Sequence, residues 1–105
     1  MKPQRIQLRR AAGFNLQTSS AALNGLPAVV VSRPTKWGNP YKLSEFSGSP
    51  ARKAELAVAA FSQMVQTNRD SRILAKLELR GKNLACWCPP GAACHADILL
   101  QIANE

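Results

Sequence analysis

The first 42 residues of the chain contain no aspartate or glutamate, although seven lysines and arginines lie among them. The remaining residues carry seven bases and six acids, so almost all of the net charge of +8 belongs to the first part of the chain. This asymmetry favours an anionic partner: a nucleotide, a phosphorylated metabolite, a nucleic acid or an acidic protein surface. The alternative is a charge that only keeps the surface solvated.

The chain also lacks a long apolar run and has few cysteines. No stretch approaches the roughly 18 apolar residues of a membrane span, so we expect no membrane partner. The basic N-terminus is not followed by an apolar stretch, which argues against a secretory signal. Three cysteines are an odd number, and 46% hydrophobic residues can form a core without disulfides. We therefore expect a protein of the reducing cytoplasm.

Two short strands are predicted in the basic part of the chain. Polar and apolar residues alternate over residues 5–9, which is typical of a half-buried strand with Ile6 and Leu8 inward. The β-branched run at residues 28–32 predicts a buried strand. Residues 11–27 contain Gly, Asn, Ser and Thr without a sustained period, so we expect a flexible loop or an insertion there.

Helical patterns dominate the second part. Ser49 followed by Pro50 predicts the start of a helix that ends near residue 68. A second helix should be capped by Asp70 or Ser71 and stopped by Gly81. Its apolar side is expected to consist of Ile73, Leu74, Leu77 and Leu79.

A third strand over residues 83–88 and a C-terminal helix over residues 95–103 complete the predicted elements. The order β-β-α-α-β-α predicts an α/β fold. Residues 1–105 should form a small single domain with a three- to four-stranded sheet and about three helices.

All three cysteines and the only histidine fall within ten consecutive positions, as Cys86, Cys88, Cys94 and His95. Residues two apart on a strand share a face, so the thiols of Cys86 and Cys88 should lie together, opposite Trp87. Four such side chains could bind zinc, although the spacing is uncommon and adjacent Cys and His side chains leave the backbone in different directions. The alternative is that the cysteines are core residues and His95 is a helix cap.

The same segment has the pattern of a strand, a Pro/Gly loop and the start of a helix. Unpaired N–H groups at such a helix start attract phosphate and lower the pKa of a thiol. Cys94 and Cys88 are therefore candidate nucleophiles, and His95 is a candidate proton donor or phosphate ligand. No arginine lies between Cys94 and Glu105, which disfavours a cysteine phosphatase.

The irregular loop after the second predicted strand carries a second group of candidates. Arg33 and Lys36 are candidate phosphate ligands. Trp37 could stack on a base or ribose, and Asn39 could fix its polar edge. The alternatives are solvated charges, a packed indole and a turn shaped by Asn39.

Residues 30–41 and 79–88, with Cys94 to Asp97 and the opening strand, resemble the small bacterial and phage domain-of-unknown-function family 4326. The resemblance covers nearly the whole chain. It implies a single compact domain in which the Trp-Gly-Asn-Pro loop and the Cys/His loop belong together. It also implies that residues 15–26 are a variable insertion.

These patterns predict one ligand site at the carboxyl edge of the sheet, where open α/β sheets bind ligands. The site would consist of Arg33, Lys36, Trp37, Asn39, Cys88, Cys94 and His95. We expect it to bind a nucleotide or a nucleotide-like phosphorylated metabolite, for catalysis or for sequestration.

Two other functions remain open. One is a basic nucleic-acid-binding domain stabilised by zinc, with metal ligands Cys86, Cys88, Cys94 and His95. The other is an interaction protein that docks on an acidic partner.

Overall fold

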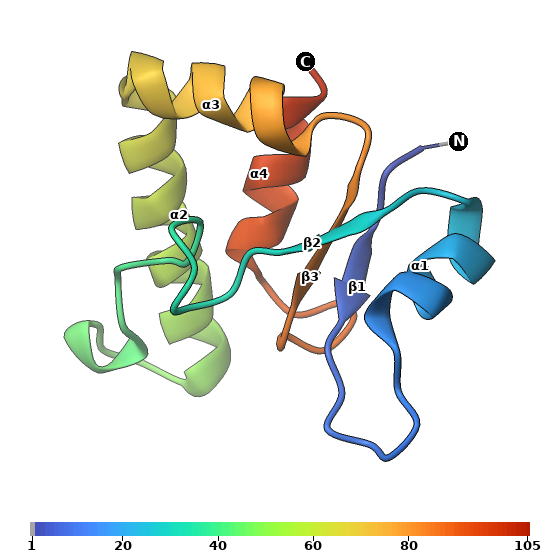
Figure 1. The fold of residues 1–105 in the computed structure, drawn as a ribbon. Helices are drawn as coiled ribbons and strands as arrows, with labels where there is room; N and C mark the ends of the chain where they lie inside the picture. Colours follow the sequence, from blue (N-terminus) through green and yellow to red (C-terminus); the bar gives the residue numbers. More distant parts are fainter. Residues whose placement is uncertain (1) are drawn as a thin grey trace.

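The computed structural model describes residues 2–105 and has a parallel three-stranded sheet at its centre (Figure 1). The strands β1 (Arg5–Gln7), β3 (Asn83–Cys86) and β2 (Ala28–Val30) lie in the order β1-β3-β2. β3 pairs with both neighbours, and all four of its residues are buried. The predicted α/β class is therefore confirmed, with three strands, although β3 ends at Cys86 and not at residue 88.

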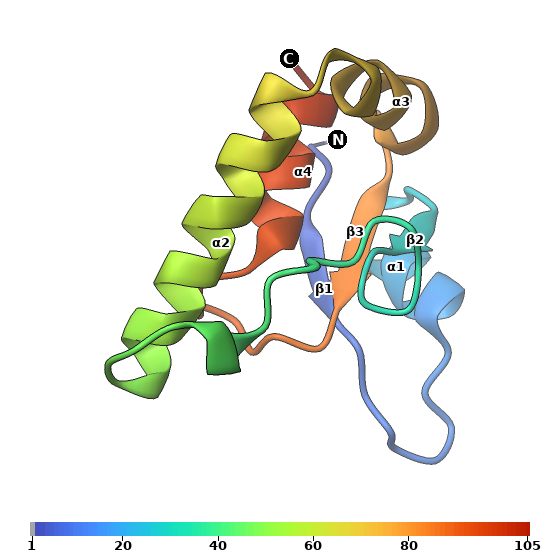
Figure 2. The same ribbon diagram turned by 90° about the vertical axis from the view of Figure 1, so that its left-hand side faces the viewer.

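Residues 2–105 contain four α-helices. They are α1 (Leu16–Asn24), α2 (Pro50–Thr67), α3 (Arg69–Leu79) and α4 (His95–Ala103), and a short 3-10 helix, η1 (Leu43–Glu45), precedes α2. Of the four, α4 and α1 contact the sheet. In Figure 2, α4 lies between α2 and the sheet, and α1 lies on the other side of the sheet. α3 lies at the end of the molecule where the C-terminus is found (Figures 1 and 2).

The start signals predicted for α2 are present. The side chain of Ser49 accepts a hydrogen bond from the backbone N–H of Arg52 at 3.2 Å, and Pro50 is the first helical residue. The cap of α3 is Asn68 and not Asp70 or Ser71, since the Asn68 carboxamide accepts from the N–H of Ser71 at 3.0 Å. Asn68 has an extended backbone and separates the two helices, because it is both the C-cap of α2 and the N-cap of α3.

The prediction of a flexible loop over residues 11–27 is wrong, because α1 lies within that range. Asn15 caps the helix by accepting a hydrogen bond from the Thr18 N–H at 3.0 Å, and Gly25 ends it in the left-handed conformation, at φ +78°. The buried residues of α1 are polar, namely Ser20 and Asn24. A helix that buries a polar face gives no apolar period in the sequence.

The predicted apolar side of α3 is also wrong in most of its residues. Leu79 is fully buried together with Ala75, but Leu77 is 75% exposed. Ile73 and Leu74 are 44% and 42% exposed. The helix packs against α4 and α2 through the stripe that holds Ala75 and Leu79, so Ile73, Leu74 and Leu77 lie at the surface.

The hydrophobic core joins the sheet to α2, α3 and α4. Its largest members include Phe61 of α2, Leu79 of α3, Leu84 of β3, and Leu99 and Ile102 of α4. Ile6 and Leu8, expected to point inward, are half-buried. Among residues 2–105, no helix has the length and apolarity needed to cross a membrane.

Candidate functional site

A cavity of about 350 Å³ lies where the loops after β2 and β3 meet α2. Its apolar wall includes Tyr41, Leu43 and Val58, and its polar wall includes Ser32 and Arg33. The three cysteines and His95 line the same cavity. Because the strands are parallel, both loops leave the sheet at its carboxyl edge, as the sequence predicted.

A wider and more open depression lies beside the junction of α2 and α3. It is lined by residues such as Gln63, Thr67 and Asp70, and neither a thiol nor His95 reaches it. We place the candidate site in the smaller cavity because that cavity holds the reactive side chains.

Five of the seven predicted site residues line this cavity: Arg33, Asn39, Cys88, Cys94 and His95. Lys36 and Trp37 are not part of its wall. The Lys36 ammonium forms an ion pair with Glu78 of α3 at 2.7 Å and lies 5.4 Å from the ring centre of Trp37. Trp37 packs against the hydrophobic core. The loop therefore turns Lys36 toward α3 and Trp37 toward the core.

Asn39 has a structural role in the loop. Its Nδ2 donates to the carbonyl of Ala57 at 3.1 Å, and its Oδ1 accepts from the N–H of Tyr41 at 2.9 Å. The carboxamide thus holds the loop against α2. This contact matches the turn-shaping alternative for Asn39.

Arg33 is the one cationic side chain in the cavity wall among the residues that the structure describes. It is exposed and takes part in none of the ion pairs found within residues 2–105. The loop folds so tightly here that a Cβ on Gly38 would lie 2.6 Å from the Arg33 Cγ and 2.9 Å from its Cα. Glycine at position 38 therefore permits the close approach that places Arg33.

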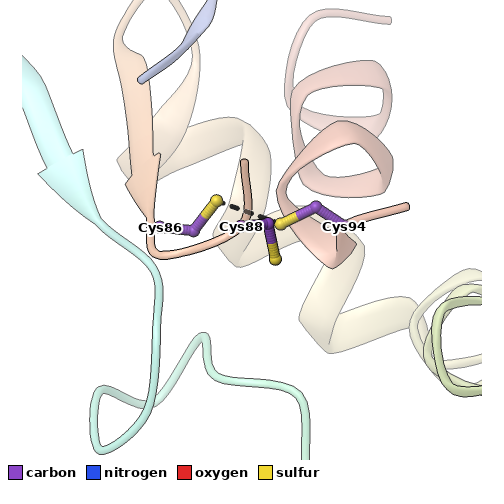
Figure 3. A group of neighbouring side chains, drawn as sticks. All are labelled: Cys86, Cys88 and Cys94. Carbon is purple, nitrogen blue, oxygen red and sulfur yellow. Dashed lines mark hydrogen bonds between the residues drawn. The ribbon is translucent and has the colours of Figure 1, made fainter. Parts of the chain in front are cut away.

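The three thiols form one cluster (Figure 3). The Sγ atoms of Cys86, Cys88 and Cys94 all lie within 4.8 Å of one another, and those of Cys86 and Cys94 are 3.0 Å apart. All three cysteines are free, and only Cys88 is not fully buried. Cys86 and Cys88 therefore lie together as expected, and the cluster could hold a metal ion. The expected position of Trp87 on the opposite side is wrong, because β3 ends at Cys86 and Trp87 lines the same cavity as both cysteines.

His95 is buried and forms a hydrogen bond with the residue that follows β2. Its Nε2 lies 2.7 Å from the carbonyl oxygen of Val31. A carbonyl only accepts, so Nε2 carries the proton, and Nδ1 of the neutral ring offers its lone pair. Nδ1 lies 3.9 Å from the Sγ of Cys94, and the ring meets Phe61 edge to face at 5.1 Å. His95 is therefore fixed in position and tautomer, and it is not a helix cap.

The thiols differ in how easily they ionise. A hydrogen bond from the Cys86 thiol lowers the pKa of Cys94, against the effect of burial. The same hydrogen bond, together with burial, raises the pKa of Cys86. Burial, followed by the contact with Cys94, raises the pKa of Cys88 to about 11. The contact between Cys86 and Cys94 therefore favours a thiolate at Cys94 and neutral thiols at Cys86 and Cys88.

Arg5 is a site residue that the sequence reading missed. Its guanidinium donates to the carbonyls of Ala92 at 3.0 Å and Pro89 at 3.1 Å, and to the carboxylate of Asp97 at 3.1 Å. The side chain is only 12% exposed. Arg5 therefore clamps the loop between Cys88 and Cys94. No local pattern indicates this, since the partners are more than 80 positions away.

A second arginine from the N-terminal segment lies near the cavity wall. The guanidinium of Arg10 stacks over the ring of Trp87 at 4.8 Å from its centre. Trp87 lines the cavity and is 44% exposed. The basic N-terminal segment therefore contacts the rim of the site.

Comparison with known proteins identifies the family of the chain. No curated protein and no solved structure matches it. A family model matches residues 14–105, which include both loops, the cavity and all three thiols. The chain therefore belongs to the family described as domain of unknown function 4326.

Proposed function

We propose that this domain binds a nucleotide or a similar phosphorylated metabolite in the cavity at the carboxyl edge of the sheet. The observation that carries the proposal is the position of Arg33, a cation without an ion-pair partner among residues 2–105, in the wall of a largely apolar cavity. Such a combination suits a ligand with a flat apolar body and an anionic end.

The size of the cavity limits the ligand. Small-molecule sites have volumes of about 300–1,000 Å³ and combine apolar walls with a few polar groups. At about 350 Å³, this cavity is at the lower end of that range. A mononucleotide or a smaller phosphorylated compound therefore fits better than a dinucleotide.

The ligand-binding roles that we propose for individual residues differ in part from those expected from the sequence. Arg33 would hold the phosphate through its planar guanidinium. Tyr41 and Trp87 line the cavity and replace Trp37 as the rings available for stacking. A catalytic version of the proposal assigns the nucleophile to Cys94, with Cys88 and His95 beside it. A sequestration version needs no reacting group.

Titration calorimetry with mononucleotides and inorganic phosphate at low salt tests the proposal. Arg33→Ala should weaken binding about 10- to 100-fold, because a hydrogen bond to a charged group contributes about 1.5–3 kcal/mol. Lys36→Ala is the matched control: it removes the same charge from the same loop, but outside the cavity. Equal losses in both variants, or no binding of any mononucleotide, would overturn the proposal.

A second candidate is a basic nucleic-acid-binding domain that a metal ion in the thiol cluster would stabilise. The stacking of Arg10 on Trp87 favours it, since this pair joins the basic segment to the cavity rim. Binding to single-stranded oligonucleotides would then grow with their length and fall steeply with salt. If neither mononucleotides nor oligonucleotides bind, docking on an acidic protein becomes the leading proposal.

A further inference from the structure

We propose that the thiol cluster is a zinc site, in which Cys86, Cys88 and Cys94 supply three thiolates and Nδ1 of His95 supplies the fourth ligand. The site does not depend on which ligand enters the cavity. It assigns a metal centre to cysteines that also pack in the hydrophobic core, as Cys86 and Cys94 do, or against it, as Cys88 does.

The first argument is the spacing of the sulfurs. With Zn–S bonds of about 2.3 Å and Zn–N bonds of about 2.0 Å, tetrahedral ligands lie about 3.8 Å apart for two sulfurs and about 3.5 Å for sulfur and nitrogen. The three Sγ atoms lie within 4.8 Å of one another, and one pair is already 3.0 Å apart. The sulfurs of Cys86 and Cys94 would have to move apart by about 0.8 Å to reach these values.

The second argument is the state of His95. A zinc-bound histidine usually donates its other ring N–H to a carbonyl or carboxylate, which fixes the tautomer. His95 does this through Nε2 and the carbonyl of Val31, and its Nδ1 lies 3.9 Å from the Sγ of Cys94. Cys94 is extended, at φ −151° and ψ 138°, and His95 begins α4. Nδ1 of His95 thus lies beside Cys94 but outside the group of three sulfurs that lie within 4.8 Å of one another, so the imidazole would move toward Cys86 and Cys88 when it binds zinc.

The third argument is the chemistry of the donor set. Three thiols that are buried or half-buried lie side by side, and none forms a disulfide. Sulfur and imidazole donors suit Zn²⁺, and three cysteines with one histidine are a known ligand set of structural zinc sites.

The ligands come from three segments that the fold already holds in place. Cys86 ends β3, Cys88 lies in the following loop, and Cys94 and His95 begin α4. Arg5 holds that loop through the carbonyls of Pro89 and Ala92. Zinc would link the central strand to α4, so binding energy would add directly to folding stability. It would also make these thiols ligands, which leaves binding, and not thiol catalysis, as the task of the cavity.

The first experiment measures metal content. The full chain, expressed without a polyhistidine tag and purified in reductant without chelator, should contain one zinc per chain by elemental analysis. Loss of a residue that hydrogen-bonds to a metal ligand lowers metal affinity by about 10- to 100-fold. Loss of a ligand itself should cost more, so Cys88→Ser should weaken zinc binding by more than about 100-fold. Trp87→Ala is the control, because it lies between two ligands, offers no ligand atom and should keep the zinc.

The second experiment identifies the fourth ligand. X-ray absorption of the zinc-loaded wild-type protein should show three sulfurs and one imidazole nitrogen. Cobalt substitution of His95→Gln should keep the thiolate charge-transfer bands and shift the ligand-field bands. A wild-type spectrum with three sulfurs and no imidazole would overturn the assignment of His95, even if the variant does not fold.

The outcomes that overturn the metal site are equally direct. One is a purified chain without metal that takes up neither zinc nor cobalt and melts cooperatively with or without chelator. Another is an intact mass lighter by two hydrogens, which would show that two of the three thiols form a disulfide. A stoichiometric metal other than zinc would overturn the identity of the ion. All these measurements are made without nucleotide, so they stand apart from the test of the cavity.

Discussion

The side chains of Asn24 and Asn83 exchange two hydrogen bonds, each 2.8 Å long, although the residues are 59 positions apart. Asn83 also accepts from the backbone N–H of Gln4 at 2.9 Å and donates to the hydroxyl of Ser20 at 2.7 Å. It is fully buried. One carboxamide at the start of β3 therefore joins α1, the central strand and the segment before β1.

Asn83→Ala should destabilise the protein by at least about 2 kcal/mol, because it leaves several buried polar groups unpaired at about 1–3 kcal/mol each. Urea unfolding followed by circular dichroism measures this loss. Asn15→Ala is the control: it removes an exposed cap of α1, which costs about 1 kcal/mol. If both variants lose the same amount, the buried network does not hold α1 in place.

Arg5→Lys should loosen the loop that carries Cys88 and Cys94. Lysine keeps the charge, but its ammonium lacks the rigid planar set of donors with which the guanidinium binds two carbonyls and a carboxylate. We expect a loss of about 1.5–3 kcal/mol, the range for hydrogen bonds to a charged group, and faster amide exchange in residues 88–94. Arg9→Lys, at an exposed position, should change stability by less than about 0.5 kcal/mol. If amide exchange in residues 88–94 is the same in Arg5→Lys as in the wild type, Arg5 does not restrain this loop.

Substitution of two leucines of α3 should lower the stability of the protein to very different extents. Leu77→Ser should change stability by less than about 0.5 kcal/mol, because this side chain is 75% exposed. Leu79→Ala should cost about 2–5 kcal/mol, since Leu79 is fully buried in the core. Thermal or urea unfolding separates the two. A large loss in Leu77→Ser would contradict the packing of α3 found here.

Gly38→Ala should both destabilise the protein and weaken ligand binding. The added Cβ would meet backbone atoms of Arg33 at 2.9 Å, so the loop must shift at a cost of about 1–3 kcal/mol and move the guanidinium. Gly13→Ala is the control. Gly13 has φ +82° but open space around it, so the change costs about 1–2 kcal/mol of backbone strain without affecting the cavity. Wild-type affinity in Gly38→Ala would show that Arg33 does not hold the ligand.

Much of the fold follows from local patterns in the sequence. Ser49 and Pro50 specify the start of α2, and the β-branched run over residues 28–32 contains β2. The position of the cavity follows as well, since loops after parallel strands meet at one edge of the sheet. The close spacing of the cysteines and the histidine predicts the thiol cluster, because residues near in sequence and joined by a short loop cannot lie far apart. Binding of a nucleotide stays a prediction.

Only the tertiary structure decided which side chains face the cavity and which polar groups are buried. Lys36 and Trp37 have the chemistry of ligand residues, but Glu78 and the core hold them elsewhere. Arg5 and Asn83 stabilise the fold through hydrogen bonds to partners that lie 59 to 92 positions away along the chain. Local patterns report the preferences of residues within a few positions of one another, on one helix face or strand face. Hydrogen bonds and ion pairs between distant segments form only when the chain has packed, so no spacing in the sequence encodes them.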